Sequence, residues 1–129
     1  MTHNKTNLTT ENTDHHLLPH SWKLYRLTNL STFLGSSIHW VSVHRNGSFS
    51  CVLGWGHKPT ADKARRYAAQ HNLPYIALED GFLRSLDLGC KGAQPLSLVV
   101  DHTGIYYDAG EPSDLEDLLN ASGWETPEL

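Results

Sequence analysis

A strand–helix–strand pattern in the middle of the chain constrains the fold more than any other feature. Residues 49–55 are typical of a strand, and residues 75–78 of a second, buried one. Between them, Pro59 precedes Thr60, a suitable helix N-cap, and Asn72 can close the helix in a left-handed conformation. One face of this helix of roughly eleven residues carries small side chains: Ala61, Ala64 and Ala68. The order predicts a βαβ unit, and therefore an α/β fold with parallel strands and a right-handed crossover.

The region before this unit is less regular. Residues 1–21 are polar, rich in Thr and Asn, and without hydrophobic period, so we predict a disordered tail. From Trp22, leucines recur at steps of three and four, which predicts one helix that ends at Gly35: Leu24, Leu27, Leu30 and Leu34. Residues 38–43 alternate like a strand, followed by a turn over residues 45–48. That turn fits either a hairpin or a loop between two non-adjacent parallel strands, and the sequence leaves both open.

The region after the unit predicts a hairpin and a short helix. Residues 96–100 and 105–107 are strand-like and flank a turn, in which we expect Gly104 to supply a positive φ. Ser113 and Glu116 have the spacing of a capping box, and leucines give the following helix an apolar side: Leu115, Leu118 and Leu119. We expect residues 123–129 to be unstructured, which leaves one domain over residues 22–122.

Composition excludes several classes of protein. The chain has 129 residues, enough for one domain, and its net charge of −4 gives no general attraction to nucleic acid. It has no apolar leader and no run of transmembrane length, and its two cysteines form no CxxC pair, so we expect a cytoplasmic protein with reduced thiols. The nine histidines show no ligand spacing, and neither a dinucleotide fingerprint nor a P-loop occurs. We therefore expect neither a metal ion nor an organic cofactor.

Chemically useful side chains follow both strands of the βαβ unit. The stretch YIALEDGFLRS, residues 75–85, begins as a buried strand and ends in charged and polar residues. In open α/β sheets, ligands bind beyond the carboxyl ends of parallel strands. We therefore expect the loops after the two strands to form one site. The candidates are Trp55, His57 and Lys58 in the first loop and Glu79, Asp80, Arg84 and Ser85 in the second.

Four sequence blocks carry a family likeness. GWGHKPTADKA, LEDGFLRSLDLG, PLSLVVDHTGIYYDA and PSDLEDLL follow in unbroken order between Val52 and Asn120. Together they resemble the N-terminal part of the KpsC/LpsZ-type capsule polysaccharide proteins, which are bacterial retaining β-Kdo glycosyltransferases. Residues before Ser50 match only loosely, and the first twenty do not match. The resemblance implies a Rossmann-like partial domain, half of a two-domain glycosyltransferase-B-like architecture, with the hairpin and the short C-terminal helix added to it.

The resemblance also implies a function in capsule polysaccharide biosynthesis and export. In that family CMP-Kdo is the donor and a phospholipid carries the acceptor, so we expect a cytoplasmic protein that can lie peripherally at the inner membrane. The family continues past the capping-box helix with a second Rossmann-like domain that holds the nucleotide-sugar and with the carboxylate nucleophile. This chain would therefore shape the acceptor side and be inactive alone, and its partners would be that missing half or capsule export proteins. The alternative is a non-catalytic remnant or interaction module of the capsule machinery.

Within that interpretation each candidate has a chemical role and a competing structural one. Asp80 or Glu79 would orient an acceptor hydroxyl or act as its base, but adjacent strand residues face opposite ways, so at most one lines the crevice. Either carboxylate could instead cap the following turn.

The Arg84 guanidinium suits a carboxylate or phosphate, with Ser85 as a lesser hydrogen-bonding partner, or it pairs with a nearby Asp. The Trp55 ring would stack on a ligand or belong to the core. His57 and Lys58 would supply cationic groups in the first loop, with a catalytic base as a weaker alternative for His57.

Overall fold

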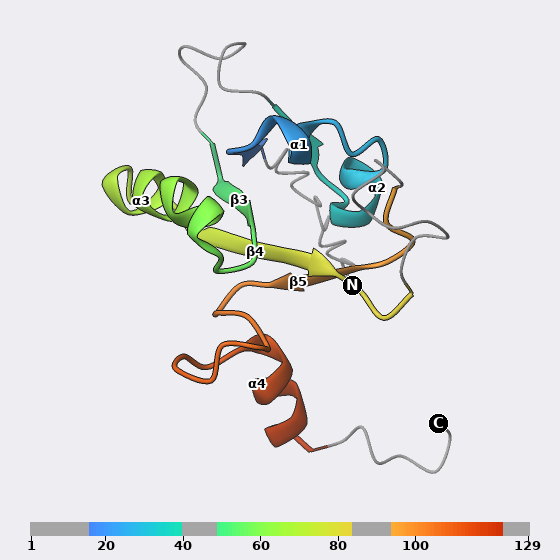
Figure 1. Cartoon of the computed structure of the whole chain (residues 1–129), viewed down its shortest axis with the longest axis vertical. Helices are drawn as coiled ribbons and strands as arrows, with labels where there is room; N and C mark the ends of the chain where they lie inside the picture. The colour runs from blue at the N-terminus through green and yellow to red at the C-terminus, as the bar shows by residue number, and fades with distance from the viewer. Residues whose placement is uncertain (1–15, 40–48, 84–93, 123–129) are drawn as a thin grey trace, which may run out of the picture.

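The protein folds around one twisted five-stranded sheet. A computed structural model describes residues 16–39, 49–83 and 94–122. Their elements, in chain order, are β1 His16–Pro19, α1 Trp22–Tyr25, α2 Leu30–Leu34, β2 Ser37–Ile38, β3 Cys51–Trp55, the 3₁₀ turn η1 Pro59–Ala61, α3 Asp62–Gln70, β4 Tyr75–Asp80, β5 Leu98–Asp101 and α4 Asp114–Asn120. Helices and strands are interspersed along the chain, so the predicted α/β fold class is confirmed (Figure 1).

The strand order is β2-β1-β3-β4-β5, with the first four strands parallel and β5 antiparallel to β4. The predicted βαβ unit is confirmed as β3-α3-β4, because β3 and β4 pair in parallel with Trp55 beside Leu78. From β1 the chain moves to β2 on one side, whereas β3 and β4 lie on the other. Such a reversal of strand order is a topological switch point, and it opens a crevice at the carboxyl ends of the two strands that flank it. Here those strands are β1 and β3.

Both faces of the sheet are covered by helices. One face packs against α1 and α2 and holds a buried cluster of Leu17, Leu24, Leu30, Cys51, Leu53 and Leu78. The other packs against α3 and holds Leu18, Val52, Ala64 and Ala68. Neighbouring strand residues contribute to opposite clusters, as the two-residue period of a strand requires. Figure 1 shows α3 on the other side of β3 from α1 and α2.

The predicted disordered tail is wrong for residues 16–21. His16–Pro19 forms β1, which lies between β2 and β3, and Leu17, Leu18 and Pro19 are buried. A strand of four residues is too short to show a period, and here it is the sheet pairing that defines it. Residues 1–15 and 123–129 lie outside the described structure, so the rest of the tail and the unstructured end stay predictions.

The leucines before Gly35 belong to two short helices and not to the single predicted one. Leu24 lies in α1 and Leu30 in α2, and residues 26–29 turn between them. The backbone N–H groups of Leu27 and Leu30 bond three residues back, which is a turn and not an α-helix. The apolar spacing survives this bend, since both helices pack on the same face of the sheet. Gly35 ends α2 at φ +59°, as expected.

The alternative left open before β3 is now decided. β2 and β3 both pair in parallel with β1 and are not neighbours, so the turn is a loop between non-adjacent parallel strands. β2 itself covers Ser37–Ile38, and residues 40–48, which include the rest of the predicted strand, lie outside the described structure.

The predicted C-terminal hairpin is wrong, because no strand follows β5 between residues 102 and 113. Asp101 is buried, and its Oδ1 accepts hydrogen bonds from the backbone N–H groups of Thr103 at 3.0 Å, Gly104 at 2.8 Å and Asp114 at 3.2 Å. This carboxylate turns the chain out of the sheet toward α4. Gly104 does not have a positive φ; an added Cβ would instead collide with the Pro112 carbonyl oxygen.

Of the three helix ends predicted for α3 and α4, one is wrong and two are confirmed. Thr60 is not an N-cap, because Pro59 starts η1 and α3 begins after Ala61. Asn72 does adopt a left-handed conformation at φ +52° after α3. The capping box of α4 is confirmed, with Glu116 N–H donating to Ser113 Oγ and Ser113 N–H donating to Glu116 Oε2. No described helix is both long and apolar enough to cross a bilayer.

Candidate functional site

A groove of about 580 Å³ lies at the topological switch point. Three strands end around it: β1 just before His20, β3 at Trp55 and β4 at Asp80. We call it the switch-point groove. Its lining residues are His20, Ser21, Lys23, Leu24, Leu27, Leu53, Gly54, Trp55, Thr60, Ala61, Ala64, Asp80 and Pro95. The groove therefore occupies the position at which open α/β sheets bind ligands.

The lining combines an apolar surface with a few polar groups. Leucines and the Trp55 ring supply the apolar part, whereas Lys23 and Asp80 bring charges of opposite sign. His20 and Ser21 follow β1 directly, and the His20 N–H donates to the Leu53 carbonyl at 3.2 Å, which fixes the chain where it leaves the sheet. Pockets of this composition orient a small ligand through a few polar contacts. The arrangement suits a molecule that carries both hydroxyl groups and an anionic group.

Asp80 and Glu79 lie on opposite faces, as their adjacency on a strand predicted. β4 continues through both residues, and of the two only Asp80 lines the switch-point groove. Glu79 is buried on the other side, where its Oε1 accepts the Trp55 Nε1–H at 2.8 Å. Lys58 Nζ lies 3.6 Å from the other oxygen, Oε2. Glu79 thus holds the indole that lines the groove and does not line it itself.

Gly56 allows this arrangement at the end of β3. Its φ is +57°, and an added Cβ would collide with the Tyr107 hydroxyl and lie 3.1 Å from Glu79 Oε2. The Tyr75 hydroxyl donates to the Gly56 carbonyl at 2.7 Å. Burial raises the pKa of Tyr75 to about 12, so this hydroxyl keeps its proton and remains a donor. A side chain at position 56 would separate Glu79 from the loop that it stabilises.

His57 lies away from the switch-point groove, although the sequence placed it in the same site. Its ring is buried, and Nδ1 lies 3.3 Å from Asp108 Oδ2 and 3.8 Å from Glu111 Oε2. Its backbone N–H donates to the Tyr107 hydroxyl at 3.0 Å. The pKa of Asp108 is lowered, first by the hydrogen bond from the Gly110 N–H and then by the one from His57. The donor atoms of His57, Asp108 and Glu111 lie within 4.8 Å of one another and could hold a metal ion.

The structure adds residues to the predicted site, whereas two of the predicted members lie outside the described residues. Arg84 and Ser85 lie outside the described residues, so their predicted roles stay predictions. The sequence missed His20, Ser21 and Lys23 in the groove, because the first two were assigned to the tail. It missed Asp108 and Glu111 beside His57, because a separation of about fifty residues hides any ligand spacing. Only the sheet topology brings these residues together.

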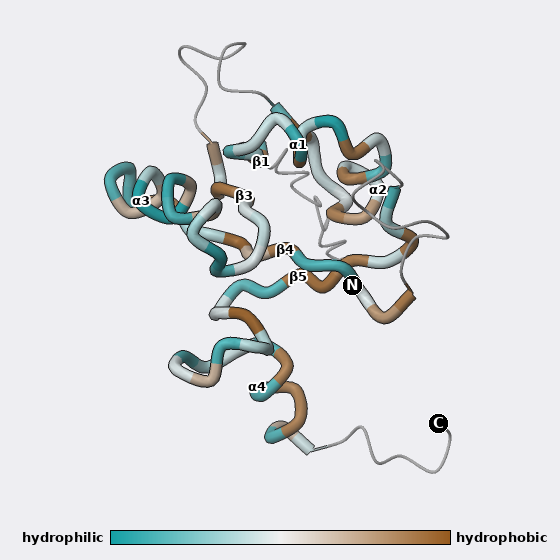
Figure 2. The backbone as a smooth tube through the Cα atoms, in the orientation of Figure 1, coloured by the Kyte–Doolittle hydropathy of each residue, from teal (hydrophilic) through white to brown (hydrophobic). Residues whose placement is uncertain are grey.

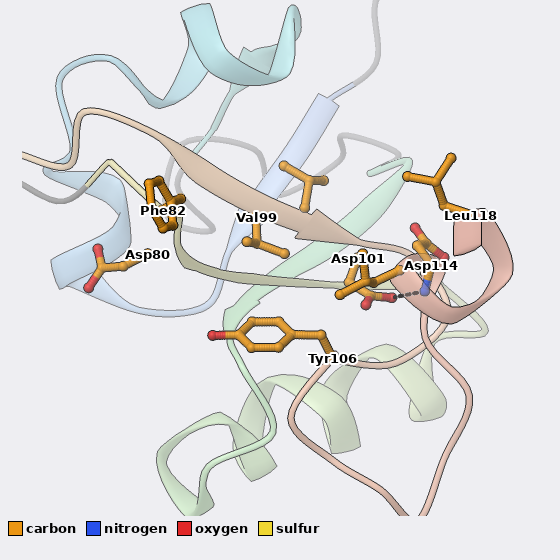
Figure 3. A pocket seen from close by; sticks show the side chains of 10 residues that line it. Asp80, Phe82, Val99, Asp101, Tyr106, Asp114 and Leu118 are labelled. Carbon is orange, nitrogen blue, oxygen red and sulfur yellow. Dashed lines mark hydrogen bonds between the residues drawn. The ribbon is translucent and has the colours of Figure 1, made fainter. Parts of the chain in front are cut away.

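A second groove, of about 780 Å³, runs along β5 to α4 (Figure 3). We call it the β5–α4 groove. It is lined by Asp80, Gly81, Phe82, Val99, Val100, Asp101, Tyr106, Asp114, Leu115 and Leu118. Phe82 is fully exposed and Leu118 is 62% exposed, and no residue of α4 is buried. Figure 2 shows apolar stretches on α4 although that helix stands away from the sheet. This apolar surface is suited to contact with another polypeptide.

The fold is that of a doubly wound α/β protein, with a groove at the carboxyl edge of a mainly parallel sheet. A family model described as capsule polysaccharide biosynthesis protein matches residues 50–128. The chain therefore belongs to this family, which confirms the resemblance seen in the four sequence blocks.

Relatives in the family are much longer than this chain. It is 61% identical over 71 residues to the capsule polysaccharide modification protein LipA of Neisseria meningitidis serogroup B, which covers 55% of this chain and 10% of LipA. It is 50% identical over 60 residues to the lipopolysaccharide-processing protein LpsZ of Rhizobium meliloti, covering 46% of this chain and 14% of LpsZ. The chain thus spans a small part of the curated relatives that it matches.

Two solved structures share the fold. The β-Kdo 2,4-transferase of Thermosulfurimonas dismutans KpsC superposes with a TM-score of 0.73 at 50% identity, covering 89% of this chain and 35% of that one. The β-Kdo 2,7-transferase of the same KpsC gives a TM-score of 0.55 at 28% identity, covering 83% and 36%. The predicted partial domain is confirmed, since the chain corresponds to about a third of each transferase.

Proposed function

We propose that this chain forms the acceptor side of a β-Kdo transferase in capsule polysaccharide biosynthesis, and that the switch-point groove binds the acceptor. The observation that carries the proposal is the groove itself, with its apolar lining, one carboxylate and a lysine at the carboxyl edge of the sheet. The similarity to two Kdo transferases supports the reaction class.

Each polar group of the groove has a task in that reaction. The Asp80 carboxylate accepts a hydrogen bond from the acceptor hydroxyl, which orients it for attack, and can take its proton. Lys23 and His20 face the carboxylate of an acidic sugar or the phosphate of a lipid headgroup. The Trp55 ring gives the apolar face of the sugar a surface to stack on. Arg84 and Ser85 follow Asp80 closely in the chain and add to the same anionic contact in this proposal.

The donor is left to the rest of the protein in this proposal. The family resemblance implies that CMP-Kdo is bound by a second Rossmann-like domain, and neither groove described here needs to hold a nucleotide. With a phospholipid-linked acceptor, the assembled enzyme works at the cytoplasmic surface of the inner membrane.

A binding measurement with the 129-residue chain tests the proposal. The probe is a soluble β-linked Kdo disaccharide on phosphoglycerol, titrated by calorimetry and compared with CMP at the same concentrations. We expect saturable binding of the saccharide and none of CMP. Asp80→Asn and Lys23→Ala should each weaken saccharide binding by at least about tenfold, since a hydrogen bond to a charged group contributes about 1.5–3 kcal/mol.

Lys63→Ala is the matched control. Lys63 is exposed on α3 and does not line the switch-point groove, so this variant removes one positive charge without touching the site. Its affinity should equal that of the wild type. If CMP binds and competes with the saccharide, or if Lys63→Ala weakens binding as much as Lys23→Ala, the groove is not an acceptor site.

A second function is favoured by the β5–α4 groove. Its exposed apolar residues fit an interaction module that binds another part of the capsule machinery. In that case substitutions on α4 would abolish association with the partner, whereas Lys23→Ala, which changes a residue of the switch-point groove alone, would leave it unchanged.

A further inference from the structure

Three potential metal ligands come together beside the loop that follows β3. His57 belongs to that loop, whereas Asp108 and Glu111 belong to the segment between β5 and α4. His57 Nδ1 lies 3.3 Å from Asp108 Oδ2 and 3.8 Å from Glu111 Oε2. One imidazole nitrogen and two carboxylate oxygens from two segments therefore converge on one point.

Two of the three spacings among these atoms are close to those around a tetrahedral ion, and all three atoms lie within 4.8 Å of one another. Zinc takes nitrogen and oxygen ligands at about 2.0–2.2 Å, which places its tetrahedral ligand atoms about 3.3–3.6 Å apart. The two distances from His57 Nδ1, 3.3 and 3.8 Å, lie at or near this range. An ion would need only a small movement of Glu111, whose side chain is half exposed and free to adjust.

The ligands are held by contacts outside the cluster, as metal ligands commonly are. The His57 backbone N–H donates to the Tyr107 hydroxyl at 3.0 Å. Asp108 Oδ1 accepts the Gly110 N–H at 3.1 Å, which leaves Oδ2 directed at His57. The Asp108 N–H bonds to the carbonyl of Ile105, a fully buried residue that anchors the segment. Two of the three ligands are thus oriented before any ion binds.

Charge balance at the cluster also favours a cation. Two carboxylates lie against one imidazole, and the other described positive charge that acts on Asp108 is that of Arg65, whose effect in lowering the Asp108 pKa is the smallest. The neighbouring Lys58 is directed at Glu79, with Nζ 3.6 Å from Oε2. A divalent ion would balance both carboxylates and leave the imidazole neutral, which is the form that binds metals.

We propose that His57, Asp108 and Glu111 form a site for one Zn²⁺ ion. The mixed set of nitrogen and oxygen ligands favours zinc over calcium or magnesium, which prefer oxygen alone. Asp108 and Glu111 are both partly exposed, which gives the ion an entry path and leaves a fourth position for water. The ion would tie the loop that carries His57 and Lys58 to the segment before α4. It is a structural clasp away from the switch-point groove and takes no part in sugar transfer.

Calorimetric titration of the chelator-treated chain with zinc chloride tests this site. We expect one ion to bind per wild-type chain. His57→Ala should bind zinc at least about tenfold more weakly, because even the loss of a residue that only supports a metal ligand lowers the affinity by about that factor. Zinc should also raise the melting temperature of the wild type, because binding stabilises the folded state. Cobalt chloride should give the visible absorption bands of a tetrahedral site.

His102→Ala is the matched control, because it also removes one histidine from a histidine–carboxylate pair. His102 Nδ1 lies 3.0 Å from Asp114 Oδ2, and this pair is not among the described groups with three possible ligands. His102→Ala should bind zinc like the wild type.

Glu111→Gln replaces His57→Ala as the test variant if His57→Ala does not fold, since Glu111 is exposed. Glu111→Gln should lose the cobalt bands while its circular dichroism stays unchanged. If the wild type binds zinc no more tightly than His57→Ala or Glu111→Gln, the site does not exist.

Discussion

Trp55 lines the switch-point groove, and its indole nitrogen donates a hydrogen bond to Glu79. The hydrogen bond from Nε1 to Glu79 Oε1 is 2.8 Å long and partly buried. Adjacent carboxylates at the end of β4 thus have separate tasks in the proposed function. Asp80 contacts the ligand, whereas Glu79 is a positioning residue that acts through the indole.

Two replacements of Glu79 should distinguish the effect of its hydrogen bond to Trp55 from the effect of its charge. Glu79→Ala leaves a partly buried indole N–H without this partner, which costs at most about 1–3 kcal/mol of folding stability. It should also shift the Trp55 indole resonance in a ¹⁵N–¹H spectrum and weaken saccharide binding. Glu79→Gln keeps an acceptor oxygen at the same position, so the resonance and the affinity should stay close to those of the wild type.

The indole resonance can be assigned with Trp55→Phe. Should Glu79→Gln weaken binding as much as Glu79→Ala, the charge of Glu79 and not the orientation of Trp55 would be what the groove requires. An unchanged indole resonance in Glu79→Ala would show that the hydrogen bond is not made.

Among the elements, β5 and α4 are joined by two aspartates and not by sheet pairing. Asp101 Oδ1 accepts the Asp114 N–H at 3.2 Å. Asp114 in turn accepts from the His102 N–H at 2.8 Å and from the Thr103 hydroxyl. These bonds hold α4 at the end of β5 although no residue of α4 is buried. The helix is placed by polar contacts at its first turn.

The stability of this junction should depend on acid pH. Burial raises the pKa of Asp114, but hydrogen bonds from Thr103 and His102 outweigh it and lower the pKa to about 2. An unfolded Asp titrates near about 3.9. The stabilisation is therefore complete above about pH 5 and is lost as the pH falls toward about 2, because the unfolded chain takes up the proton first.

Melting temperatures measured between about pH 5 and pH 2 check this prediction. The wild type should lose more stability over that interval than Asp114→Asn, which cannot titrate at this position. Asp117→Asn is the control, since Asp117 is an exposed carboxylate on the same helix. Equal slopes for wild type and Asp114→Asn would mean that the junction does not depend on the Asp114 charge.

The elements that the sequence predicts well are those whose causes are local. The βαβ unit follows from two apolar runs around a helix with small residues on one face, and the α4 cap follows from Ser113 and Glu116 three residues apart. The C-terminal hairpin fails because Asp101 bonds to a residue thirteen positions later, which no strand pattern reveals. β1 fails for a related reason, since a four-residue strand is defined by its neighbours β2 and β3.

In the candidate site, too, the residues predicted correctly are those whose position has a local cause. Asp80 and Trp55 were predicted because strand ends can be read from the sequence, and the structure places both in the switch-point groove. His20 and Lys23 were not, because they enter the groove only through the position of β1 in the sheet. The separation of His57 from the groove depends on the left-handed turn at Gly56, which sends the next residue toward Asp108.

For the whole molecule, the β5–α4 groove is the surface that most needs a partner. The chain corresponds to 35% of the KpsC 2,4-transferase, so most of that protein has no counterpart here. In the 129-residue chain, Leu115, Leu118 and Leu119 are 45%, 62% and 55% exposed on one short helix. Among the described strands β5 lies at the edge of the sheet, where backbone groups can pair with another strand.

We therefore expect the isolated chain to associate with itself through this groove, with a weight-average mass in sedimentation experiments that rises with concentration. Leu118→Glu should shift the protein toward monomer, because it places a charge on the apolar surface and beside the acidic residues Asp101 and Asp114. Phe33→Glu is the matched control: Phe33 is 40% exposed on α2 and does not line the groove, so association should persist. A wild type that stays monomeric and melts cooperatively at high concentration would mean that the apolar face of α4 is stable in water without a partner.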